Sequence, residues 1–391
     1  MLSFDEAMKL ILGKARLLGS ETVPLAAACG RVLARDVVSD VDMPPFDKSA
    51  MDGYACRRED LPGPFRVIET IQAGVEPLKA VGSGECAKIM TGARVPQGAD
   101  CVLMVEHTEN DGDGSIRFMK TATETNICFH GEDVRKGEVV LRRGTRLDPR
   151  HIAVLAAAGC VLPEVACRPG VGIIATGGEL VEPDMIPGTA QIRNSNSAQI
   201  RARLEQACAA VTYYGIVPDE EPQLDAAFKR ALAENDVVVF SGGVSMGDFD
   251  FVPEIMARNG IEILFDAIAV KPGKPTTFGV GPSVYCFGLP GNPVSTFMQC
   301  EVLVKPFLYA LMGHAYQAPW TQWPLADSFS RTKEEREAWI PVVRTPEGTV
   351  LPKPYHGSAH STALVDAYGF MVVPQKVAHI QEGTLVRVWP L

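Results

Sequence analysis

Between Gly170 and Gly313 the chain alternates short apolar runs with segments of helical periodicity, and this alternation constrains the fold more than any other feature. The apolar runs are rich in β-branched and aromatic residues, which predicts strands at 171–175, 211–217, 237–240 and 284–287. The other segments predict helices at about 195–209, 221–234, 251–259 and 293–312. Strands that alternate with helices form a mostly parallel sheet covered on both faces, so we expect a three-layer α/β domain over 170–313.

The chain before this domain combines helical and β-rich character. Ser3 followed by Glu6 is a capping-box pattern, and the apolar spacing after it predicts that the first 40 residues are largely helical. A further helix is expected between Asp148, as its cap, and Gly159. The runs between these helical parts are short, β-type and broken by Gly and Pro. We therefore expect a discontinuous helical linker domain (1–41 and 142–169) and an inserted β-rich lobe (42–141).

The chain after the α/β domain is expected to form a small β domain over 319–391. Strand candidates lie near 339–343, 370–373 and 385–388. The Pro- and Trp-containing stretch from Pro319 to Pro324 is interpreted as a linker.

Charge and cysteine usage exclude several classes of protein. A formal charge of −10 over 391 residues disfavours a nucleic-acid partner, because duplex binders carry a basic surplus. The ten cysteines form no CxxC pair, which argues against a zinc site or a disulfide scaffold. The acidic N-terminus does not resemble a signal peptide, and no apolar run approaches the roughly 18 residues of a membrane span. We expect a cytoplasmic protein without membrane contact.

Acidic and glycine-rich loops follow the predicted strands of the α/β segment. Because the carboxyl ends of parallel strands meet at one edge of a sheet, Glu179, Asp219 and Asp250 can converge there. Glycine-rich turns at helix N-termini also suit a phosphate or oxyanion. The residues that fit this second role are Gly242, Gly243, Ser245, Asn292 and Ser295.

Three carboxylates beside an anionic ligand repel it unless a cation intervenes, and Mg²⁺ with oxygen ligands is the expected mediator. Glu179, Asp219 and Asp250 are therefore candidate metal ligands. The alternatives are that each acid caps a helix or pairs with a surface cation, and that the glycines only permit tight turns. Neither a Walker P-loop nor a Rossmann GxGxxG is present.

The segment Lys271-Pro272-Gly273-Lys274-Pro275 is a second candidate binding site. Its prolines restrict the backbone and keep two ammonium groups close together, which is costly unless an anion lies between them. A small divalent oxyanion would satisfy both lysines. The alternative is a pair of solvated surface lysines.

Three stretches of the β-rich lobe are dense in small and polar residues. They are 44–55, 89–93 and 131–138, and they indicate loops near a site, with simple turns as the alternative.

Taken in order, these segments resemble one known family. PPFDKSAMDGYA, IMTGA, GEDVRKG, TGGEL, NSNS, SGGVSMGD, KPGKP and LPGNPVS are similar to the motifs of the molybdopterin molybdenumtransferases, the MoeA family, and of the E domain of gephyrin. The resemblance runs from about residue 3 to 391. It implies a helical linker region, a β-rich lobe, a molybdopterin-binding α/β domain and a C-terminal β-barrel-like domain, assembled as an elongated homodimer with shared active sites.

The resemblance also implies roles for individual residues. Glu179, Asp219 and Asp250 would be acidic site residues, and Lys271, Lys274 and Ser295 would hold molybdate beside Pro290 and Pro293. Asp52, Thr91 and Asp133 would reach the site from the other subunit. This chain departs from the family at two places. Gly178 stands where many relatives carry Asp. Arg336, the candidate for a further molybdate contact, is followed three residues later by Trp339, where the family often has Phe.

The activity implied is insertion of molybdate into adenylylated molybdopterin with release of AMP, dependent on Mg²⁺. Implied protein partners are a molybdopterin adenylyltransferase and the molybdoenzymes that receive the cofactor. Two alternatives stay open at this point. One is molybdopterin adenylyltransferase activity, since those enzymes resemble residues 170–313, and the other is a gephyrin-like scaffold.

Overall fold

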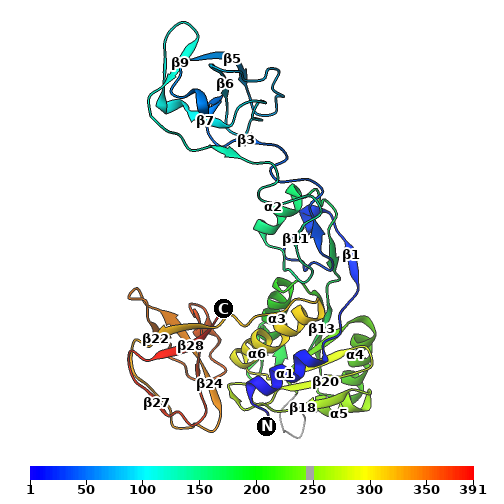
Figure 1. Ribbon diagram of the computed structural model, residues 1–391. Helices are drawn as coiled ribbons and strands as arrows, with labels where there is room; N and C mark the ends of the chain where they lie inside the picture. Colours follow the sequence, from blue (N-terminus) through cyan, green and yellow to red (C-terminus); the bar gives the residue numbers. More distant parts are fainter. Residues whose placement is uncertain (244–250) are drawn as a thin grey trace.

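The computed structural model describes residues 1–243 and 251–391 and has an elongated shape (Figure 1). The β-rich lobe lies at one end, and the α/β domain and the C-terminal β domain lie side by side at the other. A small region that contains helix α2 (Pro149–Ala157) connects the two ends. The expected multidomain α/β plus β fold class is confirmed.

The α/β domain is built on a six-stranded sheet in the order β16-β13-β17-β21-β20-β18. The first four strands are parallel, and β20 and β18 are antiparallel at the edge. The strand bounds are β13 (Gly170–Thr176), β16 (Ala210–Val217), β17 (Val237–Ser241), β18 (Glu262–Phe265), β20 (Thr277–Val280) and β21 (Tyr285–Leu289). The four predicted strands are therefore present.

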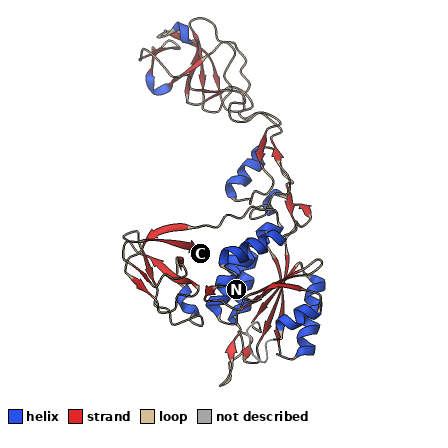
Figure 2. Ribbon diagram, turned by 60° about the horizontal axis from the view of Figure 1, so that its bottom comes forward, coloured by secondary structure: helices blue, strands red, loops and turns tan. Residues whose placement is uncertain are grey.

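Helices cover both faces of this sheet, as the periodicity predicts (Figure 2). They are α3 (Ser195–Gln206), α4 (Glu221–Glu234), α5 (Val252–Arg258) and α6 (Pro293–Gln299). On β13, Ile173 packs into the core under α3 and α6, and its neighbour Ile174 packs into the core under α4 and α5. Successive side chains of a strand point to opposite faces, so a strand buried on both sides is apolar throughout.

The single helix expected at 293–312 is instead three segments. Helix α6 is followed by a π-helical turn (Cys300–Val304) and by α7 (Lys305–Leu311). Pro306 stands at the start of α7 and cannot donate a backbone hydrogen bond. The turn carries Glu301, a fully buried acid that pairs with Arg203 and Lys305 and accepts a 3.0 Å hydrogen bond from the indole of Trp389.

The prediction that the first 40 residues are largely helical is wrong beyond Lys14. Helix α1 (Phe4–Lys14) has the expected capping box, in which Ser3 and Glu6 exchange hydrogen bonds. After it the chain turns extended, and β1 (Ser20–Thr22) pairs with β12 (Glu164–Ala166). Gly19 and Pro24 flank β1, and both residue types disfavour helix. Helix α2 has Asp148 as its cap and Pro149 at its start, as expected.

The β-rich lobe contains a six-stranded sheet in the order β7-β4-β6-β5-β9-β8. Its faces pack against two separate small cores. The strands are β4 (Gly53–Cys56), β5 (Phe65–Ile71), β6 (Glu85–Ile89), β7 (Cys101–Met104), β8 (Thr108–Asn110) and β9 (Ser115–Phe118). Two short pairs complete this half of the chain: β3 (Lys48–Ser49) with β10 (Ile127–Cys128), and β2 (Val37–Val38) with β11 (Val139–Leu141).

The C-terminal domain forms a sheet in the order β19-β24-β26-β28-β22, to which β25 is added beside β24. The strands are β22 (Thr321–Pro324), β24 (Glu337–Arg344), β25 (Val350–Pro352), β26 (Gly369–Val373) and β28 (Leu385–Pro390). The interpretation of 319–324 as a linker is thus wrong for its last four residues. Pro324 is tolerated because β22 is an edge strand.

One strand of this sheet comes from the α/β domain. Strand β19 (Val270–Lys271) pairs in parallel with β24, so that Lys271 lies opposite Ala338. The sheet of the C-terminal domain therefore extends into the predicted lysine segment.

Candidate active site

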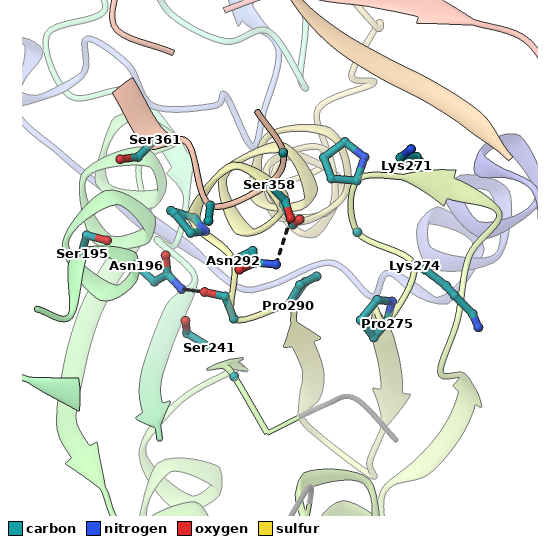
Figure 3. Close-up of a pocket in the computed structure, with 18 of the residues that line it drawn as sticks. Ser195, Asn196, Ser241, Lys271, Lys274, Pro275, Pro290, Asn292, Ser358 and Ser361 are labelled. Atoms are coloured by element: carbon teal, nitrogen blue, oxygen red, sulfur yellow. Dashed lines mark hydrogen bonds between the residues drawn. The ribbon is translucent and has the colours of Figure 1, made fainter. Parts of the chain in front are cut away.

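A cavity of about 1330 Å³ lies between the strand ends of the α/β domain and the C-terminal domain. Its wall includes the residues that follow β13, β17 and β21, the lysine segment, and residues of β24 and of the loop after β25 (Figure 3). Of the residues singled out from the sequence, it contains Glu179, Asp219, Gly242, Gly243, Lys271, Lys274, Pro290, Asn292, Pro293, Ser295 and Arg336.

The two described acids lie on the wall at the ends of β13 and β16. Asp219 accepts hydrogen bonds from the Thr176 hydroxyl and, at 3.1 Å, from the Gly178 amide. These donors join the loops after two neighbouring strands and fix the orientation of the carboxylate. Glu179 comes from the first of these loops, and its carboxylate lies over Gly177.

Gly242 and Gly243 sit where larger residues would not fit. Both have positive φ, +93° and +66°. A Cβ on Gly242 would lie 2.5 Å from the carbonyl oxygen of Thr176, and one on Gly243 would lie 2.7 Å from the Thr176 methyl group. The glycines are therefore required by backbone conformation and close packing, as well as lining the cavity.

The lysine segment presents two exposed ammonium groups at the cavity (Figure 3). Among the described residues neither Lys271 nor Lys274 has an ion-pair partner. Between them Pro272 and Gly273 are buried, so the segment is held from behind while the charged groups stay in solvent. The acids and the lysines thus line one common cavity.

The N-terminus of α6 is partly occupied by the C-terminal domain. The Val294 amide donates to the Ser358 carbonyl at 3.0 Å, and the Asn292 side chain donates to the Ser358 hydroxyl at 2.8 Å (Figure 3). One donor of the Asn292 side-chain amide is therefore already used, although the residue lines the cavity as predicted for it. Ser295 is buried but lines the cavity, with Pro290 and Pro293 beside it.

Arg336 lies on the cavity wall, but one of its donors is already used. Its Nη1 donates to the Val270 carbonyl at 3.1 Å, next to Lys271. The guanidinium therefore supports the lysine segment in addition to facing the cavity.

Several cavity residues were not found from the sequence. They include Arg193, Asn196, Lys333, Lys353, Tyr355 and Ser358. Burial raises the pKa of Tyr355 to about 12, so its hydroxyl stays protonated at neutral pH. Asn196 nevertheless lies in the NSNS motif, whereas Arg193, Lys333, Lys353 and Tyr355 reach the wall through tertiary placement.

Basic groups outnumber acidic ones on the described wall. The wall includes two carboxylates, of Glu179 and Asp219. It also includes seven basic side chains, which are those of Arg193, Lys271, Lys274, Arg331, Lys333, Arg336 and Lys353. Such a surface attracts a polyanion even though the whole chain carries a formal charge of −10.

The three candidates from the β-rich lobe do not line this cavity. Asp52 accepts hydrogen bonds from the Thr91 amide at 2.6 Å and from the Thr91 hydroxyl at 2.8 Å. These bonds, the backbone one foremost, lower the pKa of Asp52. Asp133 is exposed on a separate loop of the same lobe. Within one chain this lobe lies at the opposite end of the molecule from the cavity (Figure 1).

Asp250, one of the three predicted metal ligands, lies outside the described residues, as does Ser245. Across 1–243 and 251–391 there is no cluster of three or more His, Cys, Asp or Glu side chains arranged for a metal. Glu179 and Asp219 nevertheless offer hard oxygen donors on one wall. Mg²⁺ is commonly held by one or two carboxylates together with substrate phosphates, so these donors fit that ion.

No helix within the described ranges combines the length and the apolarity that a membrane crossing requires.

Three family models together match most of the chain. They are the MoeA N-terminal region (domain I and II) at residues 2–159, a probable molybdopterin binding domain at 172–310, and the MoeA C-terminal region (domain IV) at 323–391.

Curated relatives and solved structures agree with these models. A Bacillus subtilis protein named molybdopterin molybdenumtransferase is 35% identical, with 98% of this chain and 93% of the relative covered. A Staphylococcus epidermidis protein of the same name is 36% identical, with 99% and 95% covered. A molybdopterin biosynthesis MoeA protein from Pyrococcus horikoshii OT3 has 32% identity and a TM-score of 0.86, with all of both chains covered.

Proposed function

Since the chain belongs to the MoeA family of molybdenum-cofactor biosynthesis enzymes, we propose that it inserts molybdate into adenylylated molybdopterin and releases AMP. The observation that carries this proposal is the shared cavity, which is lined both by two exposed lysines without described partners and by two carboxylates. The substrates are a dianionic oxyanion and a phosphoanhydride, and cations outnumber anions among the described charged residues that line the cavity.

In this mechanism Lys271, Lys274 and Ser295 hold molybdate beside the two dithiolene thiols. Their sulfurs replace one oxo ligand on molybdenum, which leaves as water with the two thiol protons. Arg336 keeps the lysine segment in place through the Val270 carbonyl. Positioning and electrostatics supply most of the acceleration, because the reacting groups need only to be aligned and their charge compensated.

Glu179 and Asp219 are the described residues that would hold Mg²⁺, with Asp250 as the third proposed ligand. Mg²⁺ would withdraw charge from the phosphoanhydride that is cleaved. The bonds from Thr176 and Gly178 hold the Asp219 carboxylate in a fixed orientation, so little reorganisation accompanies binding.

We further propose that Asp52, Thr91 and Asp133 act in the cavity of a second copy of the chain, in a homodimer with shared sites. The support is their location, since they lie on a lobe at the opposite end of their own chain (Figure 1). The proposal places the protein in the cytoplasm, in contact with an adenylyltransferase that supplies its substrate and with the molybdoenzymes that receive the product.

The test uses the purified full-length protein with adenylylated molybdopterin and Mg²⁺, in the presence and absence of molybdate. AMP release that depends on molybdate is the expected result. Adenylylation of metal-free molybdopterin by ATP, without such AMP release, would overturn the proposal in favour of the adenylyltransferase alternative.

A further inference from the structure

We infer that Gln299 is a positioning residue that fixes the separation of Lys271 and Lys274, an inference that rests on the proposed function. Gln299 is the last residue of α6, is fully buried, and lies behind the lysine segment. Its Nε2 donates to the carbonyl oxygen of Gly273, between the two lysines, at 3.3 Å.

The carbonyl of Gly273 is held from two directions. The hydroxyl of Thr276, also fully buried, donates to the same oxygen at 2.9 Å. The following carbonyl, of Lys274, accepts from the amides of Ile268 and Thr276, each at 3.0 Å. Buried donors thus turn both carbonyls inward, which leaves the two lysine side chains on the solvent face.

The fit between Gln299 and the segment is tight. Gly273 has φ of +99°, and a Cβ at this position would lie 2.3 Å from Nε2 of Gln299. A residue other than glycine would therefore displace the amide or the segment. The amide and the glycine form one complementary contact.

Gln299 is not explained by stability alone. Its Oε1 is buried and has no hydrogen-bond partner among the described residues. A buried carbonyl oxygen without a partner destabilises a fold, so an apolar side chain of the same length would suit this core better. By contrast Glu301, two residues later, forms ion pairs with Arg203 and Lys305 and accepts a hydrogen bond from the indole of Trp389. The contact of Nε2 with Gly273, at the centre of the lysine segment, is what indicates a role for Gln299 in the site.

The experiment compares Gln299→Met with Thr277→Val in the full-length protein. Thr277 is the matched control, because its hydroxyl is equally buried, equally without a described partner, and does not contact the Gly273 carbonyl. Molybdate binding is measured by titration calorimetry, the steady-state constants by AMP release, and folding by thermal denaturation.

Gln299→Met is expected to bind molybdate about fivefold more weakly, because the lysine segment is less preorganised and has to be ordered when the anion binds. Its KM for molybdate rises accordingly, while kcat at saturating molybdate stays close to that of the unaltered protein and the Tm does not fall. Thr277→Val should leave molybdate binding unchanged. Thr276→Val, which removes the other donor to the same carbonyl, should weaken binding in the same direction.

Unchanged molybdate binding in Gln299→Met, or an equal loss in Thr277→Val, would overturn the inference and leave the proposed function standing. Failure of the unaltered protein to bind molybdate at all would instead overturn the site on which both rest. The two failures are therefore distinguishable in one set of titrations.

Discussion

In the proposed mechanism single side chains decide how strongly the cavity attracts an oxyanion, and the two exposed lysines are the clearest case. Removing the ammonium group in Lys271→Ala or Lys274→Ala should weaken molybdate binding about 10- to 100-fold, the effect of one lost charge-assisted hydrogen bond. The measurement is a molybdate titration followed by the rate of AMP release. Lys229→Ala is the control, because Lys229 is 63% exposed and pairs with Asp225 on α4. Equal binding by all three variants would contradict the assignment.

At this scale the sequence was informative only where residues lie in local motifs. The lysine segment and the loops after the strands could be located because prolines, glycines and charges are concentrated there. Arg193, Lys333 and Lys353 could not, since each is an ordinary surface cation in its own segment and joins the cavity wall only through the tertiary fold. The use of the Asn292 amide by Ser358 was hidden for the same reason, because its partner is 66 residues away.

Strand β24 gives a prediction for a secondary-structure element. Burial raises the pKa of Glu337, the residue that begins this strand, and Asp5 adds to the effect. The folded protein thus holds a proton more tightly there than the unfolded chain does. Stability is therefore lost as pH rises from the ordinary carboxyl pKa, about 4.3, through the raised value.

Glu337→Gln removes this titration and keeps the acceptor for the 2.8 Å hydrogen bond from the Trp339 indole. The variant should be more stable than the unaltered protein at pH 7.5, and the difference should shrink as the pH approaches about 4. Urea denaturation at several pH values measures both. A difference of stability that does not vary with pH would argue against a charged, destabilising Glu337.

Elements were predicted best where one periodicity extended over many residues. The α/β alternation predicted four strands and located the helices around them, because apolar burial on both faces leaves a continuous pattern. Strand β22 was missed since its pairing with β28 supplies what its own sequence does not indicate. The π-helical turn that divides the 293–312 helix lies just before Pro306, whose missing backbone N–H is a local sign of the interruption.

In the whole molecule, Asp52 lies on the lobe at one end and Lys274 lines the cavity at the other end. This separation permits a test of whether two subunits share their sites. At a molybdate concentration far below the weakened Kd of Lys274→Ala, this variant and Asp52→Asn should each be inactive as homodimers. When the two are mixed and allowed to exchange subunits, half of the dimers combine them, and each of those has one intact site. Activity should therefore recover to about a quarter of that of the unaltered protein.

The measurement is molybdate-dependent AMP release before and after mixing. A mixture of Asp52→Asn with Asp133→Asn serves as the control, because both changes lie in the same lobe and no mixed dimer would have an intact site. Recovery in the control, or none in the test mixture, would mean that the lobe does not contribute across the dimer.

The pairing of β19 with β24 has a consequence for how far this protein can be shortened. A chain ending near residue 313 would keep both described carboxylates, yet Lys271 would lose the neighbouring strand that fixes its backbone. The final domain is consequently a structural part of the wall that we propose binds the anion, and we expect a catalytically competent minimal fragment to include it.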